Sequence, residues 1–439
     1  MRRTLLLATA GASLLLGGVL ALRHHVQAQG NQPAPVASED GIVSISHSEP
    51  VPHSTEPAED VGPVAGLDLL HLTLTEGAVT APADSGTAKL TLDPALQREA
   101  LGLMEAHHLP EAAVVLMDVA TGKLLAYASH VDHGALHDLC VEATAPSASV
   151  FKIVTGAALV EDAHLSPDTK QCYSGGEQRI NSADLVEDPQ RDRWCTTLAG
   201  AMGRSLNTVF ARLAKERLTP TQLEAMAQRF GYADPIAFDV PVQAGALRVP
   251  SEPLEFARTA AGFWNTTLSP LQAAEISAIV AREGEPVRPS IVEQVVAPTG
   301  AIVWTAPDAR TSRHVIAKDT AAQLQTMMEH TVSEGTCFKA FHDPKGSAFL
   351  PGIQVAGKTG TLTEAETQRY YTWFTGFAPT HPDPGVRQVA VAVLVVNGPS
   401  WQVKANVVAR DVLRAYFAEQ GLQGVTRPGI HEIARRHKK

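Results

Sequence analysis

Two groups of strand-like segments, one toward each end of the chain, are the feature that most limits what this sequence can fold into. Segments rich in apolar and β-branched residues lie at 112–119, 123–129, 353–357, 372–378 and 389–396. The first two are joined by Ala120-Thr121-Gly122, a turn sequence that predicts a hairpin. Residues 165–335 have mainly helical patterns. One antiparallel sheet built from both groups, with a helical lobe inserted between them, satisfies this order.

Helical segments are expected around this sheet. Asp93 is suited to cap a helix whose first residue is Pro94, and residues 403–417 predict a closing helix. Residues 150–163 are apolar nearly all round, which is typical of a helix buried in the middle of a domain. We therefore expect the main domain to span residues 90–425.

The N-terminus predicts export. After the basic start Met1-Arg2-Arg3, residues 4–22 form an uncharged and mostly apolar run that is long enough to span a bilayer. Val26-Gln27-Ala28 could serve as a cleavage site, but the basic residues at 23–25 separate it from the apolar run. We favour an uncleaved anchor within residues 1–28 over a cleaved signal peptide. Both alternatives place the protein in the cell envelope, on the periplasmic or extracytoplasmic face of the membrane.

The segments that flank the main domain differ from it in composition. Residues 29–66 are acidic, rich in proline and without aromatic residues, which predicts a disordered linker. Residues 67–89 are expected to be a short segment that precedes the domain, with at most one strand at 67–74. Residues 426–439 end in a run of basic side chains and are expected to form a solvated tail.

Charge and cysteine content exclude some classes of function. The chain has 36 basic and 46 acidic residues and a net charge of -10, which argues against nucleic acid as a partner. Its four cysteines (Cys140, Cys172, Cys195 and Cys337) form no Cys-x-x-Cys pair, so a structural zinc site of the usual spacing has no support. In an exported chain, Cys172 and Cys195 are the preferred disulfide pair because they flank one insertion-like segment, although four free thiols remain an alternative.

Three short motifs carry the chemistry. The first is Ser149-Val150-Phe151-Lys152, at the start of the buried helix. A serine at a helix N-terminus lies among free backbone N–H groups, and a lysine three residues later lies on the same face. An apolar surrounding would lower the pKa of Lys152, so that its neutral amine could accept the proton of Ser149. By itself this motif is weak, because Ser149 could simply cap the helix.

The second and third motifs strengthen this interpretation. Ser205-Leu206-Asn207 follows on a helical or loop segment, and Lys358-Thr359-Gly360-Thr361 is expected at the end of a strand. A lysine and hydroxyl groups beside a glycine form an edge where the carboxylate of an extended peptide can bind, and Gly360 lets a substrate backbone approach.

In this order the three motifs resemble the signatures of penicillin-binding proteins and serine β-lactamases. Other segments also resemble the transpeptidase domain of penicillin-binding proteins: Leu92–Gln97, the hairpin through Gly122, Ser269–Gln272, Glu334–Thr336 and Trp373–Pro379. The resemblance covers about residues 90–420. It implies a mixed α/β (α+β) fold of three layers, α/β/α, with an antiparallel five-stranded sheet and an inserted helical lobe.

The resemblance also implies a role for each motif residue. Ser149 would form the acyl-enzyme, Lys152 would activate it, and Ser205 would relay a proton to or from the leaving amine. Asn207 would hold Lys152 and the substrate amide, and Lys358 would set the electrostatics of the site. The residues that bind the terminal carboxylate and its backbone would be Thr359, Gly360 and Thr361. The N–H groups of Ser149 and Thr361 would form the oxyanion hole, and neither a metal nor an organic cofactor is needed.

The implied function is that of a D,D-transpeptidase that cross-links peptidoglycan stem peptides and is acylated by β-lactams. A D,D-carboxypeptidase is the main alternative, because both reactions pass through the same acyl-enzyme. A bifunctional polymerase is not expected, since residues before 90 leave no room for a glycosyltransferase or a large pedestal domain. Where the family often has glycine close before the nucleophile, this chain has Pro146-Ser147-Ala148, so Ser147 is a decoy to exclude.

Less favoured alternatives rest on other residues. A serine β-lactamase needs a base that activates water, for which Glu252 and Glu255 are the only tempting carboxylates. A sensor acylated by β-lactams would need several membrane spans, and only one apolar segment is present. A metal site at His130, Asp132, His133 and His137 is conceivable from their spacing, but a polar, solvated loop is the simpler interpretation.

Overall fold

The computed structural model describes residues 44–45, 64–176, 179–307, 314–364, 366–399 and 403–436, all within one compact unit, Ala34–Lys439. The predicted anchor or signal peptide at 1–28 and most of the predicted linker lie outside the described residues. In the described part of the chain, no helix is both long and apolar enough to cross a membrane.

The central sheet has six strands in the order β1-β13-β14-β15-β5-β6. Five of them form the expected antiparallel sheet: β5 (Glu111–Asp118), β6 (Leu124–Val131), β13 (Ala356–Glu364), β14 (Arg369–Ala378) and β15 (Val389–Asn397). The two-residue strand β1 (Ser44–Ile45), within the range predicted as linker, pairs in parallel with β13. The hairpin between β5 and β6 and the contribution of both chain ends are confirmed.

Both faces of this sheet are buried, which follows from its sequence. The strand β15 is apolar at almost every position, a pattern typical of a strand covered on both sides. Alternate residues enter two separate cores: Val391 and Val393 pack with helices on one face, and Ala392 and Leu394 pack on the other. Helices α1 (Pro94–Ala106) and α10 (Ala405–Glu419) cover the first face, and α7 (Pro270–Ala281) and α8 (Lys318–Ser333) cover the second. The three-layer prediction is therefore confirmed.

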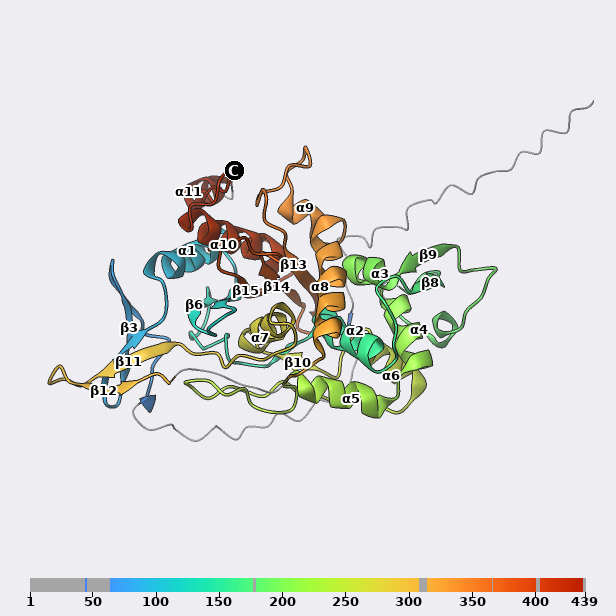
Figure 1. Ribbon diagram of the computed structural model, residues 1–439, viewed down its shortest axis with the longest axis horizontal. Helices are drawn as coiled ribbons and strands as arrows, with labels where there is room; N and C mark the ends of the chain where they lie inside the picture. Colours follow the sequence, from blue (N-terminus) through green and yellow to red (C-terminus); the bar gives the residue numbers. More distant parts are fainter. Residues whose placement is uncertain are drawn as a thin grey trace, which may run out of the picture. The chain divides into compact units, whose positions relative to one another are not determined.

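The inserted helical lobe lies beside α8 (Figure 1). Its helices are α2 (Lys152–Glu161), α3 (Leu198–Arg204), α4 (Asn207–Arg217), α5 (Pro220–Arg229) and α6 (Pro253–Ala260), preceded by the 3₁₀ turn η2 (Ala148–Phe151) and joined by η3 (Ser182–Leu185). The lobe also contains two small sheets that the helical pattern did not predict. These pair β7 (Ala145–Pro146) with β10 (Thr267–Leu268) and β8 (Lys170–Tyr173) with β9 (Trp194–Thr197).

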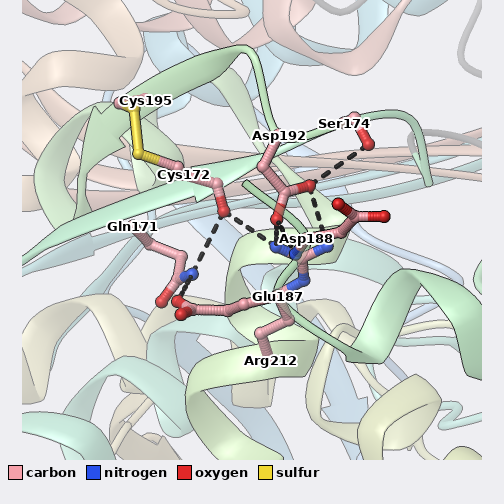
Figure 2. The surroundings of a disulfide bond; sticks show 8 residues. All are labelled: Gln171, Cys172, Ser174, Glu187, Asp188, Asp192, Cys195 and Arg212. Atoms are coloured by element: carbon pink, nitrogen blue, oxygen red, sulfur yellow. Dashed lines mark hydrogen bonds and ion pairs between the residues drawn. A yellow bond between two sulfur atoms is a disulfide. The ribbon is translucent and has the colours of Figure 1, made fainter. Parts of the chain in front are cut away.

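A disulfide closes the β8–β9 hairpin, as predicted. Cys172 and Cys195 are directly opposite in the register and their Sγ atoms are bonded, whereas Cys140 and Cys337 are buried free thiols. Arg212 of α4 reaches this hairpin: its guanidinium donates to the Cys172 carbonyl at 2.9 Å and to the Asp192 carboxylate at 2.6 Å (Figure 2). The Arg212 side chain is fully buried. The hairpin is therefore held by a buried ion pair in addition to the disulfide.

A second sheet corrects the predicted start of the domain. Its strands are β2 (Thr73–Leu74), β3 (Val79–Ala83), β4 (Gly86–Leu90), β11 (Val292–Val296) and β12 (Ile302–Thr305), in the order β12-β11-β4-β3-β2. Buried Val79 and Ala88 belong to the same core as the helical lobe. Folded structure therefore begins well before Leu90, because residues in this segment pair with strands two hundred positions later.

The C-terminal segment is also more ordered than its basic composition indicated. Helix α10 is followed by α11 (Ile430–Arg436), which lies in the range predicted as a solvated tail. Ile430 packs against the core on that face of the sheet, and a Cβ at Gly102 of α1 would lie 3.0 Å from its Cδ1. The short helix α9 (Phe338–Phe341) joins α8 to the segment that leads into β13.

Candidate active site

The turn that carries Ser149 is tighter than the predicted helix start. Residues Ala148–Phe151 form η2, and the α-helix begins only at Lys152. Ala148 has a φ of 47°, in the left-handed region that residues with a Cβ rarely adopt. Ser149 follows this residue and its side chain is partly exposed. The strained backbone therefore presents Ser149 at the surface of an otherwise buried turn.

Ser147 differs from Ser149 in its surroundings. It is completely buried, its N–H donates to the Thr266 carbonyl at 3.0 Å, and its Oγ accepts from the Tyr232 hydroxyl at 3.1 Å. The Tyr232 ring also packs edge to face on Phe151 with 5.4 Å between ring centroids. Ser147 thus anchors the turn, while Ser149 faces outward.

Lys152 is buried and makes three hydrogen bonds. Its Nζ donates to Ser149 Oγ at 2.8 Å, to Asn207 Oδ1 at 2.6 Å and to the Ala261 carbonyl at 2.6 Å. Burial lowers the pKa of Lys152 well below its ordinary value, and the charge of Lys358 lowers that pKa further. In the neutral amine, two N–H groups can stay bonded to Asn207 and Ala261, which leaves the lone pair directed at the Ser149 hydroxyl.

The carbonyl of Ala261 is a part of the site that sequence reasoning missed. It lies just beyond the end of α6, and Thr155 of α2 fixes the neighbouring Ala260 by donating to its carbonyl at 2.8 Å. Gly262 has a φ of 80°, and a Cβ at this position would clash with the Ala148 carbonyl. No sequence motif marks a backbone carbonyl. Gly262 is the one sequence signal here, because a glycine is needed where two backbone segments pass this close.

The second motif lies at the junction of α3 and α4. Ser205 ends α3 with a φ of 58°, and Asn207 is the first residue of α4. The sharp turn between them lets the two side chains reach different lysines: Asn207 Oδ1 accepts from Lys152, and Ser205 Oγ accepts from Lys358 at 2.8 Å. The predicted proximity of motifs one and two is therefore found in the structure.

The third motif lies within β13 rather than at the end of a strand. Lys358 is the third residue of β13, and Thr359, Gly360 and Thr361 continue the strand opposite Phe374, Trp373 and Thr372 of β14. Burial lowers the pKa of Lys358 to about 7. A Cβ on Gly360 would lie 3.2 Å from the Ala148 Cβ. The strand therefore passes directly beside the Ser149 turn, with Thr359 and Thr361 partly exposed.

Thr336 connects the second and third motifs. Its N–H donates to the Gly203 carbonyl at 3.0 Å, and its Oγ1 lies 2.6 Å from Thr359 Oγ1. Gly335 beside it is required, because a Cβ there would clash with the same Gly203 carbonyl. Sequence reasoning noted Glu334-Gly335-Thr336 as a family segment but assigned Thr336 no place in the site.

The residues that supported the less favoured alternatives have other contacts. Glu252 caps α6 by accepting from the Glu255 N–H at 2.8 Å, and Glu255 accepts from Arg258 at 2.6 Å and from the Trp264 ring N–H at 3.0 Å. His137 lies 2.8 Å from the Glu142 carboxylate. In the described part of the chain, no three His, Cys, Asp or Glu side chains are grouped to hold a metal ion.

A hydroxyl held against a buried amine that can lose its charge is the arrangement by which serine acyltransferases form an acyl-enzyme, and this places the chain in that class. The sequence profile described as the penicillin binding protein transpeptidase domain matches residues 112–414. The chain therefore belongs to the penicillin-binding protein transpeptidase domain family.

Individual proteins of this family are similar over most of the chain. The peptidoglycan D,D-transpeptidase PbpA of Mycolicibacterium smegmatis is 28% identical over 348 residues, which are 71% of this chain and 68% of that protein. The crystal structure of the D,D-transpeptidase domain of a peptidoglycan glycosyltransferase from Eggerthella lenta has a TM-score of 0.63 at 26% identity, and the match covers 76% of this chain and 83% of that one. Penicillin-binding protein A of M. tuberculosis, as a ceftriaxone acyl-enzyme complex, shares the fold with a TM-score of 0.61 at 23% identity, over 75% of this chain and 79% of that one.

Proposed function

We propose that this protein is a peptidoglycan D,D-transpeptidase that acts through an acyl-enzyme on Ser149. The observation that carries the proposal is the hydrogen bond from the buried Lys152 amine to the partly exposed Ser149 hydroxyl. The family membership and the name of the mycolicibacterial relative support the same reaction.

The reaction begins with proton transfer from Ser149 to neutral Lys152. The Ser149 Oγ then attacks the carbonyl carbon of the D-Ala-D-Ala peptide bond and forms a tetrahedral intermediate. Its oxyanion is stabilised by the N–H groups of Ser149 and Thr361. The C–N bond breaks as a proton reaches the leaving D-Ala nitrogen through Ser205, whose hydroxyl is bonded to Lys358. An amine of a second stem peptide then attacks the ester and releases the cross-linked product and the Ser149 hydroxyl.

Substrate binding is assigned to β13. The partly exposed hydroxyls of Thr359 and Thr361 bind the terminal carboxylate of the stem peptide, and buried Lys358 makes this edge favourable for an anion. Asn207 holds the substrate amide in addition to Lys152. A β-lactam presents the same carboxylate and a strained amide, so it acylates Ser149 in place of the peptide.

The contacts of the candidate carboxylates argue against the β-lactamase alternative. Glu252 and Glu255 are bonded to α6 and to Arg258, which leaves neither as an obvious base for a hydrolytic water. The Cys172–Cys195 disulfide supports an oxidising compartment, in agreement with an extracytoplasmic location and an N-terminal membrane segment.

The test is covalent labelling of the purified protein by a fluorescent penicillin. Wild type and Ser147→Ala should be labelled, and Ser149→Ala should not, with mass spectrometry locating the adduct. Labelling that survives Ser149→Ala would rule out this nucleophile. A thioester analogue of the stem peptide, supplied with and without a D-amino acid, then separates transfer from hydrolysis: transpeptidation predicts product that contains the D-amino acid.

A further inference from the structure

A cavity of about 450 Å³ lies between α5 and α7, formed by residues other than the three motifs. The lining includes apolar side chains such as Ile279 and Val315, the C-terminal part of α5 and the turn Phe230–Gly231. The charged residues at the cavity are Arg229, Asp234 and Glu275.

Glu275 differs from the other polar residues of α7. Gln272 donates to the Phe230 carbonyl at 3.4 Å, and Ser277 lies 2.7 Å from Thr375 Oγ1. Among the described residues, the Glu275 carboxylate has no hydrogen-bond or ion-pair partner. Glu275 is partly exposed where it lines the cavity, and the burial of the rest of its side chain raises its pKa to about 7.

The remaining charges at the cavity leave it electronegative. Arg229 is bound to the Glu161 carboxylate at 2.6 Å, so its charge is already compensated. Asp234 is exposed and has no ion-pair partner in the described part of the chain. The end of α5 adds the partial negative charge of its last carbonyl groups. A carboxylate beside an apolar wall is suited to an ammonium group on a short aliphatic stem.

We propose that this cavity binds a small alkylammonium cation, with the ammonium group on Glu275, and that occupancy changes the rate of acylation at Ser149. The connection to Ser149 is short. Gly231 lines the cavity, and the next residue, Tyr232, donates to Ser147 and packs on Phe151. Ser147 and Phe151 lie on either side of Ser149 in the sequence. A ligand that displaces the Phe230–Gly231 turn would therefore also displace the turn that carries Ser149.

Binding is tested by titrating the full-length protein with pentylammonium chloride, monitored by calorimetry. We expect saturable binding to wild type, weaker by about ten-fold in Glu275→Gln because the charge is lost. Glu224→Gln is the matched control, since Glu224 is an exposed carboxylate of α5 outside the cavity, and it should bind as wild type does. Equal affinity for uncharged 1-pentanol, equal affinity in Glu275→Gln, or no saturable binding to wild type would overturn the site.

Coupling is tested by the rate of labelling with a fluorescent penicillin at saturating pentylammonium. The rate should change by about two-fold or more in wild type and Glu224→Gln, and it should not change in Glu275→Gln. An unchanged rate in liganded wild type would overturn the coupling. This readout rests on the proposed acylation of Ser149, whereas the titration does not, so failure of the proposed function would leave the binding result intact.

Discussion

The two sides of the candidate site are built by different means. On the helical side, Ala148, Ser205 and Gly262 all have positive φ, and the Ser149 turn is held by contacts between distant segments. On the strand side, Lys358 and Thr359 lie in the unbroken register of β13 with β14. Strain and long-range hydrogen bonds thus position Ser149, the proposed nucleophile, while regular pairing positions the strand that is proposed to bind the carboxylate. The helical side should therefore be the more sensitive to substitution.

Removal of Lys152 should have the largest effect. We expect Lys152→Met to lower the rate of acylation by about 10²- to 10⁴-fold, because the proton acceptor for Ser149 is lost. The measurement is the time course of labelling by a fluorescent penicillin, with the exposed Lys339→Met as a control.

The pH dependence gives a second test of the same residue. Only the neutral amine accepts a proton, so acylation by wild type should rise with pH through the lowered pKa of Lys152. A rate that is independent of pH, or that is equal in Lys152→Met, would contradict the assignment of the base.

Loss of the disulfide tests how far the helical side depends on the β8–β9 hairpin. The double variant Cys172→Ser, Cys195→Ser should lower the free energy of unfolding by about 3 kcal/mol, because the denatured chain is no longer constrained. Urea denaturation measures the change, and Cys140→Ser, which removes a free thiol, is the comparison. A double variant as stable as wild type would show that the Arg212–Asp192 ion pair alone holds the hairpin.

Substitution of one glycine on each side of the site, Gly262 and Gly360, compares the sensitivity of the two sides directly. Gly262→Ala places a Cβ at a φ of 80° and against the Ala148 carbonyl, and it should cost roughly 1–3 kcal/mol of unfolding free energy and slow acylation. Gly360→Ala meets only the Ala148 and Trp373 side chains at 3.2 Å, so it should cost less than about 1 kcal/mol. Thermal unfolding and labelling rates measure both variants. A larger loss of unfolding free energy in Gly360→Ala than in Gly262→Ala would contradict the greater sensitivity of the helical side.

The smallest expected effect is at Thr336. Thr336→Val keeps the shape of the side chain but removes the hydrogen bond to Thr359, worth about 1 kcal/mol or about five-fold in acylation efficiency. Thr336→Ser should restore the rate. If Thr336 acts by orienting Thr359 toward a carboxylate, the loss should be absent with the methyl ester of benzylpenicillin. An equal loss with the acid and the ester would indicate a general effect on the fold.

The sequence alone predicts the parts of the site that are formed by reactive side chains, but not those formed by the backbone. The types and order of Ser149, Lys152, Asn207 and Lys358 predict that they lie together, and the structure brings them together. The pairing of Cys172 with Cys195 is confirmed. The Ala261 carbonyl could not be predicted, since every residue has a carbonyl and only the folded chain decides which one faces Lys152. The sequence predicts the third motif at the end of a strand, whereas β13 continues through it; Gly357 and Gly360 weaken the strand pattern there.

The same limit applies to the fold. The central strands were predictable because both faces are buried and their residues are almost uniformly apolar. The strands at 79–90 and 292–305 were missed because they are short, partly exposed and paired across the whole helical lobe. The sequence of helix α11 predicts a tail because its basic side chains outweigh Ile430 and Ile433, the two residues in it that pack against the core.

The pairing of β15 with β5 means that the central sheet can be completed only late in folding. Val389 lies opposite Asp118, and Val396 lies opposite Glu111. The segment with Ser149 therefore emerges long before its partner strands, and β5 has an unpaired edge until nearly the whole chain has been delivered. Closing so long a loop is slow. Acylation of Ser149 should therefore become possible only after β15 has been synthesised and has paired with β5.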